Sequence, residues 1–194
     1  MKHLSTTARR VATVIAAASL TGLIAATTFA ASSSGTKLAA DTAPAAVPAC
    51  TAADLGAWVA VDQGNGAAGS IYYPLQFTNL SRHACAMRGF PGVSVLDRNG
   101  HQLGSPARWA TRVPARTVVL APGATAHTIL QYSDVEVTTA PGCHPVFSTF
   151  ELRIYPPGQY GATHAFFGLE ACSHAGPIYM SVEPILSGVG TING

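Results

Sequence analysis

The sequence predicts an all-β protein, an immunoglobulin-like antiparallel β-sandwich with two disulfides. Short apolar runs with a two-residue period recur along the chain, as expected of half-buried strands. Turn residues separate these runs, since the 194 residues include 19 glycines and 13 prolines. No segment of ten or more residues shows the 3.6-residue apolar period of a helix. About eight to ten short strands with Gly/Pro turns are typical of a β-sandwich.

The predicted strands follow one another from residue 55 to residue 182. They are expected at 55–61, 71–78, 85–88, 93–96, 101–103, 117–120, 125–132, 150–155, 163–169 and 178–182. In strands 71–78 and 150–155 the residues alternate between two faces, one of which is expected to be buried; in 150–155 that face contains Phe150, Leu152 and Ile154. Pro74 cannot donate to a strand ladder, so strand 71–78 is expected at a sheet edge, or with Pro74 pointing away from its partner.

Turn chemistry separates the predicted strands. Asn99-Gly100 is expected to supply the two positive-φ positions of a tight hairpin turn between strands 93–96 and 101–103. Ala121-Pro-Gly-Ala124 predicts a second turn, and Pro156-Pro157-Gly158 ends strand 150–155.

The first 30 residues are typical of a signal peptide. Met1 to Arg10 is positively charged, Val11 to Ala26 is mostly apolar, and Thr28-Phe29-Ala30 has small residues at the −3 and −1 positions of a cleavage site. The alternative is a membrane anchor, but the apolar run is shorter than the roughly 20 residues that span a bilayer. We therefore expect a flexible Ala/Ser/Thr/Pro-rich linker at 31–49, a single β-sandwich domain at 50–194, and a secreted, extracellular protein free of the membrane after cleavage.

Four cysteines, Cys50, Cys85, Cys143 and Cys172, form an even set in a chain with an export signal. Such a set favours two disulfides, and three connectivities are possible. We favour the sequential pairing, Cys50 with Cys85 and Cys143 with Cys172, because each bridge then closes a modest loop.

A metal site is the competing interpretation of the cysteines. Cys172, His174 and Met180 loosely resemble the ligand types of a blue-copper centre, which would require Cys172 as a free thiolate. The chain contains no Cys-x-x-Cys or His-x-x-x-His spacing, so the usual structural zinc patterns are absent. We expect neither a metal nor another cofactor.

The charge of the chain disfavours nucleic acid as a partner. Its net charge is +2, and without Lys2, Arg9 and Arg10 it carries 8 basic and 9 acidic side chains. The sequence has no Gly-x-Ser-x-Gly, no His-Glu-x-x-His and no phosphate-binding loop. We expect a monomeric, non-catalytic domain that binds an extracellular protein or a cell-wall component. The alternative is an exported copper carrier, or an enzyme whose site is assembled from dispersed residues.

One segment concentrates the residue types that dominate binding interfaces. From Arg82 to Arg116 there are six arginines and one aspartate, a local net charge of +5. Within it, Arg108, Trp109 and Arg112 lie in a predicted loop between two strands, and Trp and Arg are enriched in binding hot spots. These three residues form the candidate partner-binding loop. In the other interpretation, Trp109 covers the end of the core, with solvated arginines around it.

Several spaced motifs together resemble a known family. They include Leu75-Gln-Phe-Thr-Asn79, Cys85-Ala-Met-Arg-Gly-Phe-Pro-Gly-Val93, Leu120-Ala-Pro-Gly123, Cys143-His-Pro145 and Tyr155-Pro-Pro-Gly158. The family is domain of unknown function 4232, found in exported proteins and lipoproteins of actinobacteria, and the resemblance covers about residues 50–187. It implies an all-β domain with paired cysteines, and it brings no activity, ligand or catalytic residue. The lipobox of the lipoprotein members is missing here.

Overall fold

The computed structural model describes residues 46–61, 65–134, 141–147 and 149–191, and nearly all of its regular structure is β-strand. The predicted signal peptide (1–30) and residues 31–45 of the predicted linker lie outside this range. Residues 44–194 form a compact unit of their own. Backbone pairing begins before Cys50, because the Ala86 N–H donates to the Pro48 carbonyl at 2.8 Å. The end of the predicted linker therefore belongs to the folded unit.

Two larger sheets contain most of the strands. The seven-stranded sheet has the order β1 (Leu55–Val59), β3 (Ser70–Asn79), β9 (Thr125–Ser133), β14 (Met180–Val182) and β7 (Arg108–Trp109), with β2 (Asn65–Ala67) paired to β3 and β15 (Leu186–Ser187) paired to β9. The four-stranded sheet has the order β12 (Thr163–Phe166), β11 (Thr149–Tyr155), β5 (Gly92–Asp97) and β6 (Gln102–Leu103).

Two short ribbons complete the strand set. They pair β4 (Cys85–Arg88) with β8 (Thr117–Leu120), and β10 (Pro145–Val146) with β13 (Ala171–Cys172), while a 3-10 turn, η1 (Ala52–Asp54), precedes β1. The pairing of β7 with β14 is parallel, and the other pairings of these named strands are antiparallel. The predicted all-β class with antiparallel sheets is thus confirmed, and the immunoglobulin-like type stays a prediction.

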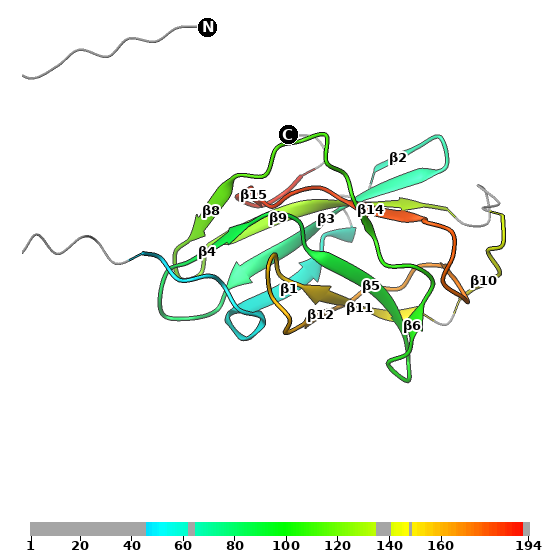
Figure 1. Ribbon diagram of the computed structural model, residues 1–194, viewed down its shortest axis with the longest axis horizontal. Helices are drawn as coiled ribbons and strands as arrows, with labels where there is room; N and C mark the ends of the chain where they lie inside the picture. Colours follow the sequence, from blue (N-terminus) through cyan, green and yellow to red (C-terminus); the bar gives the residue numbers. More distant parts are fainter. Residues whose placement is uncertain (1–45, 62–64, 135–140, 148, 192–194) are drawn as a thin grey trace, which may run out of the picture. The chain divides into compact units, whose positions relative to one another are not determined.

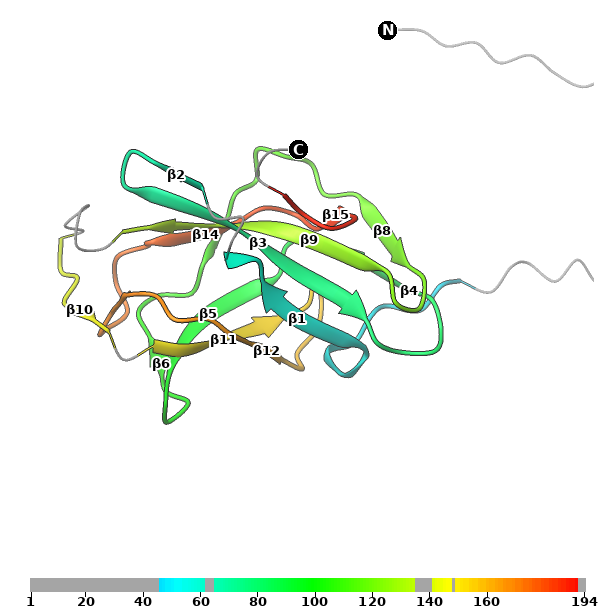
Figure 2. The same ribbon diagram turned by 180° about the vertical axis from the view of Figure 1, so that it is seen from behind.

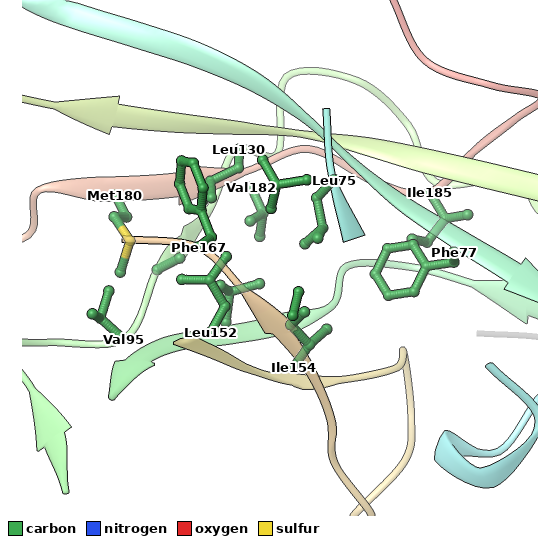
Figure 3. Close-up of a cluster of buried hydrophobic side chains, with 14 of the residues drawn as sticks. Leu75, Phe77, Val95, Leu130, Leu152, Ile154, Phe167, Met180, Val182 and Ile185 are labelled. Atoms are coloured by element: carbon green, nitrogen blue, oxygen red, sulfur yellow. The ribbon is translucent and has the colours of Figure 1, made fainter. Parts of the chain in front are cut away.

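The core lies between the two larger sheets. Both views place β1, β3, β9 and β14 in one layer and β5, β11 and β12 in the other (Figure 1, Figure 2). Side chains alternate along β9 between buried and partly exposed positions, as the two-residue period predicts. Leu75 and Phe77 from β3 lie in one cluster with Leu152 and Ile154 from β11 (Figure 3). Each such fully buried side chain stabilises the fold by about 1.5–3 kcal/mol.

The prediction of a sheet-edge position for strand 71–78 is wrong, whereas the alternative, in which Pro74 points away from a partner strand, agrees with the structure. Strand β3 pairs with β1 on one side and with β9 on the other. The Pro74 carbonyl accepts a hydrogen bond from the Ala60 N–H at 3.0 Å, one residue beyond the last β1 pair, Val59 with Leu75. In an antiparallel ladder the nitrogen and carbonyl of a residue point to the same side, so the Pro74 nitrogen points away from β9. Because proline has no N–H, Pro74 cannot donate a hydrogen bond back to β1, and the ladder between β1 and β3 ends at this residue.

The predicted inward face of strand 150–155 is wrong at Phe150. The register of β11 against β5 shifts between Thr149 and Glu151, so that Phe150 is an extra residue in a β-bulge. A bulge re-aims the side chain at its position. Phe150 is 40% exposed and contacts Phe166, with ring centroids 5.3 Å apart, whereas Leu152 and Ile154 are fully buried.

The hairpin at Asn99-Gly100 forms, but with a different turn from the one expected. Gly100 has φ +80°, while Asn99 is not among the described residues with positive φ. The Asp97 carboxylate explains the difference, because its Oδ1 accepts the Asn99 N–H at 2.8 Å and the His101 N–H at 2.9 Å. An aspartate side chain that accepts hydrogen bonds from the turn backbone stabilises a turn of its own. This hairpin turn therefore forms with a positive φ at Gly100 and without one at Asn99.

Both predicted disulfides are present in the sequential pairing. Cys50 is bonded to Cys85, which joins the start of the folded unit to β4, and Cys143 is bonded to Cys172 on β13. The two bridges span 35 and 29 residues. In the chain-entropy model, loops of this size contribute roughly 3.5–4 kcal/mol each to stability.

Candidate binding groove

A row of side chains crosses four strands on the outer face of the seven-stranded sheet. Leu130 and Val182 point into the core, so their sequence neighbours Gln131 and Ser181 point to the opposite side. The strand registers align Ser181 with Gln131, and Gln131 with Tyr72 on β3. Ser181 is also aligned with Arg108 on β7. Residues from four distant parts of the chain thus form one line across the sheet.

The segment that carries the predicted binding residues forms one wall beside this row. It was expected to be a loop, but Arg108 and Trp109 form the two-residue strand β7, parallel to β14. The Ala110 N–H donates to the Val182 carbonyl and the Ala107 N–H to the Val93 carbonyl, both at 2.8 Å. The segment is therefore tied to both larger sheets, a pairing that no local sequence pattern could indicate.

A groove of about 420 Å³ lies between this wall and the outer face of the sheet. Its lining includes all three predicted binding residues, Arg108, Trp109 and Arg112, and it also includes Tyr72, Ala110, Val113, Gln131, Ser181 and Glu183. A neighbouring hollow of about 280 Å³ shares Arg108, Gln131 and Ser181 with it. The two hollows are thus adjacent, and we call them together the β7–β14 groove.

Trp109 lies at the surface of this groove. Its side chain is 58% exposed, so the interpretation in which Trp109 covers the end of the core is wrong. Strand β7 lies at the edge of its sheet. The ring instead stacks on Phe90, with centroids 5.6 Å apart and an interplanar angle of 16°. This contact holds a large flat surface at the mouth of the groove.

The charged side chains of the groove have no partners within the described part of the chain. Neither Arg108 nor Arg112 forms a side-chain hydrogen bond or ion pair there, and the same holds for the half-buried Glu183. Glu183 is the one acidic side chain among the described lining residues. Two guanidinium groups and one carboxylate are thus available to a ligand.

The polar floor of the groove is ordered by its own hydrogen bonds. The Ser181 hydroxyl donates to Gln131 Oε1 at 2.9 Å, and Gln131 Nε2 donates to the Ser70 hydroxyl at 3.2 Å. Both ends of the Gln131 amide are fixed in this way, and each retains one further donor or acceptor position. The floor therefore presents oriented hydrogen-bonding groups.

The other half of the same outer face is covered by the C-terminal segment. The Gln76 amide makes two hydrogen bonds to the backbone of Gly190, at 2.9 and 3.1 Å. His127 Nδ1 donates to the Gly188 carbonyl at 2.9 Å. A side chain at position 190 would overlap the His127 imidazole ring. The β7–β14 groove is the half of the face that this segment leaves open.

The described residues do not assemble the copper ligands that the sequence suggested. Cys172 is bonded to Cys143 and is not a free thiolate, and Met180 is buried in the core. His174 contacts the Ser173 hydroxyl at 2.8 Å on the surface. Over the described ranges, no group of three or more His, Cys, Asp or Glu side chains could hold a metal ion.

The perturbed carboxylates lie outside the groove and have structural roles. Hydrogen bonding to the Thr51 backbone and hydroxyl lowers the pKa of Asp54, at the start of η1. The backbone N–H groups of His101 and Asn99 lower the pKa of Asp97 in the hairpin turn. Burial, with Tyr132 nearby, raises the pKa of Tyr179 above its ordinary value. These shifts belong to a cap, a turn and a core ring.

Comparison with protein families decides the identity of the domain. The model of a family described as domain of unknown function (DUF4232) matches residues 50–182, which is more than half of the chain. The chain belongs to this family. The matched part of the DUF4232 domain runs from the first disulfide cysteine to the end of β14 and includes Arg108, Trp109 and Arg112. Comparisons with curated proteins and with solved structures found no significant match. No helix in the described part of the DUF4232 domain is long and apolar enough to cross a membrane.

Sequence reasoning missed Tyr72, Gln131, Ser181 and Glu183 as groove residues. Tyr72, Gln131 and Ser181 have outward positions on their strands, which the two-residue period could have indicated, and Glu183 directly follows the end of β14. Their juxtaposition depends on the pairing of β14, β9 and β3, and strand order in a sheet is not contained in any local pattern.

Proposed function

We propose that the DUF4232 domain is an exported, non-catalytic binding domain whose ligand site is the β7–β14 groove. The observation that carries the proposal is the set of unpartnered charged side chains, Arg108, Arg112 and Glu183, around the exposed ring of Trp109. The cavity of about 420 Å³ lies within the range of about 300–1,000 Å³ for ligand pockets. The ligand is an extracellular protein or a cell-wall component.

The chemistry of the groove supports binding rather than catalysis. The hydroxyl of Ser181 donates to Gln131, and no histidine is among the described lining residues that could act as its base. A single carboxylate, Glu183, has no second acid beside it among these residues. The residues present can orient and hold a ligand, and they do not form a nucleophile–base pair.

Export of the protein is supported by covalent chemistry and by the N-terminal pattern. Two disulfides are typical of proteins that fold in an oxidising compartment. Residues 1–30 combine a basic start, an apolar run and a small-residue cleavage site. The mature protein then meets its ligand outside the cell, as a monomer.

Binding of the purified mature protein to the envelope fraction of the producing cells tests this proposal. Wild-type protein is compared with Trp109→Ala and with a matched control, Trp58→Ala. Trp58 is 45% exposed and lies on β1, at the opposite edge of the same sheet. We expect Trp109→Ala to weaken binding at least ten-fold, or about 1.4 kcal/mol, while Trp58→Ala binds like wild type. Equal binding by all three proteins would overturn the proposal.

A further inference from the structure

We infer that the ligand of the β7–β14 groove is an acidic glycan, a chain of sugars that bear carboxylate groups; this inference rests on the proposed binding function. Arg108 and Arg112 both line the groove, and neither has an acidic partner among the described residues. The planar guanidinium group binds a carboxylate through two parallel hydrogen bonds. The groove therefore offers two carboxylate-binding positions on a domain that is otherwise close to neutral.

The floor of the groove favours a ligand that is bound through side chains. Strand β9 pairs on both sides, with β3 and β14, and β14 pairs with β9 and β7, so their backbone groups are engaged within the sheet. A peptide that joins a sheet needs a free strand edge for main-chain hydrogen bonds. The edge strand here, β7, is only two residues long. Sugar hydroxyls, in contrast, can bind directly to the amide of Gln131 and the carboxylate of Glu183.

The aromatic rings of the groove suit the flat, apolar face of a sugar ring. The indole of Trp109 is exposed and is held by its stack on Phe90, and the ring of Tyr72 lines the same groove. Aromatic rings combine a large apolar surface with little conformational freedom to lose on binding. A sugar can thus contact a ring with its C–H face while its hydroxyls bind the polar floor.

The groove extends beyond its first hollow. Beyond the row of Arg108, Ser181 and Gln131 it continues into the second hollow, past Ile178 and Tyr179. Arg108 lines both hollows, and Arg112 lines the first. An acidic chain of several sugars could place successive carboxylates near the two arginines.

Titration calorimetry with three probes tests the inference. The probes are tetragalacturonate, its fully methyl-esterified form, which has the same sugars without the charge, and tetraglutamate. We expect tetragalacturonate to bind, and methyl esterification to weaken binding about ten-fold or more, because a neutral ester carbonyl replaces the charged carboxylate as the acceptor of the guanidinium hydrogen bonds. Arg108→Gln and Arg112→Gln should each weaken binding to a similar extent. Arg82→Gln, at an exposed arginine outside the groove, should leave it unchanged.

Each opposing result has a distinct meaning. If the esterified sugar binds as tightly as tetragalacturonate, recognition does not depend on acid groups and the inference is overturned. If tetraglutamate binds more tightly and Trp109→Ala abolishes that binding, the ligand is a peptide, and the proposed binding function survives without the glycan. If no probe binds although envelope binding still requires Trp109, the glycan inference alone fails. If envelope binding is also independent of Trp109, the proposed function fails as well.

Discussion

Phe90 and Trp109 stack nearly parallel, with ring centroids 5.6 Å apart, and so join the turn before β5 to the edge strand β7. The contact is a surface contact, since more than half of the Trp109 side chain is exposed. The exposure of the indole is consistent with the proposed binding role of Trp109 and not with a place in the core.

The first prediction concerns the stability of Trp109→Ala. We expect the free energy of unfolding to fall by about 0.5–1.5 kcal/mol, the magnitude of one aromatic pair. Phe77→Ala, which removes a fully buried ring, should cost about 3–5 kcal/mol. Urea denaturation of the two variants measures both values. A loss for Trp109→Ala as large as that for Phe77→Ala would show that the indole belongs to the core.

The second prediction concerns the bridge between Cys50 and Cys85. Cys50→Ser and Cys85→Ser should destabilise the protein about equally, by roughly 3.5–4 kcal/mol. The double variant should cost little more than either single variant, because both changes remove the same bond. Chemical denaturation gives the three free energies. Additive losses would contradict the pairing, as would a non-reducing peptide map that links Cys85 to Cys143.

The third prediction is a pH dependence that arises from Asp97. Hydrogen bonds from the turn backbone lower the pKa of this carboxyl in the folded state, below its ordinary value of 3.8. The ionised form therefore stabilises the hairpin at pH values above about 4, and this contribution is lost as the pH falls through the folded-state pKa. Asp97→Asn should melt below wild type at pH 7, and the gap should narrow towards pH 2. Thermal melts across this range measure it, and a gap that widens at low pH would contradict the argument.

The fourth prediction tests the fit of the C-terminal segment against His127. A methyl group at position 190 would overlap the imidazole, so Gly190→Ala should destabilise the protein by about 1–3 kcal/mol. His127→Ala makes room for the methyl group, and the double variant should cost less than the two single changes together. Gly188→Ala tests an unrelated cause, since it has a positive φ but open space around it. Strict additivity of Gly190→Ala and His127→Ala would contradict a steric contact.

Local patterns predicted the strands well where the burial of one face controls the sequence. The alternation along 125–132 corresponds to β9, and the favoured sequential pairing of the cysteines, one of three possible, is the one observed. Local patterns gave wrong predictions where the pairing between strands, and not the alternation within one strand, decides the position of a residue. Phe150 alternates with its neighbours in the sequence, yet a bulge against β5 turns it outward. Pro74 is accepted inside a sheet because the ladder with β1 ends at that residue.

The candidate site was predictable only in part. Composition alone identified Arg108, Trp109 and Arg112, because few other parts of this chain combine Trp with Arg. Their parallel pairing with β14 joins residues more than 70 positions apart, as in Ser181 with Arg108. The floor of the groove depends on the same long-range register, and no turn or periodic pattern specifies it.

The pairing of Gln76 with Gly190 has a consequence for where the domain can be cut. The family match ends at residue 182, but the fully buried amide of Gln76 has both of its hydrogen-bonding partners at Gly190. A fragment that stops at residue 182 would leave this amide exposed on a bare sheet face, together with the unpaired edge positions of β9 opposite β15. Such a fragment would expose an aggregation-prone surface. The domain should therefore be expressed with a C-terminus at residue 191 or later.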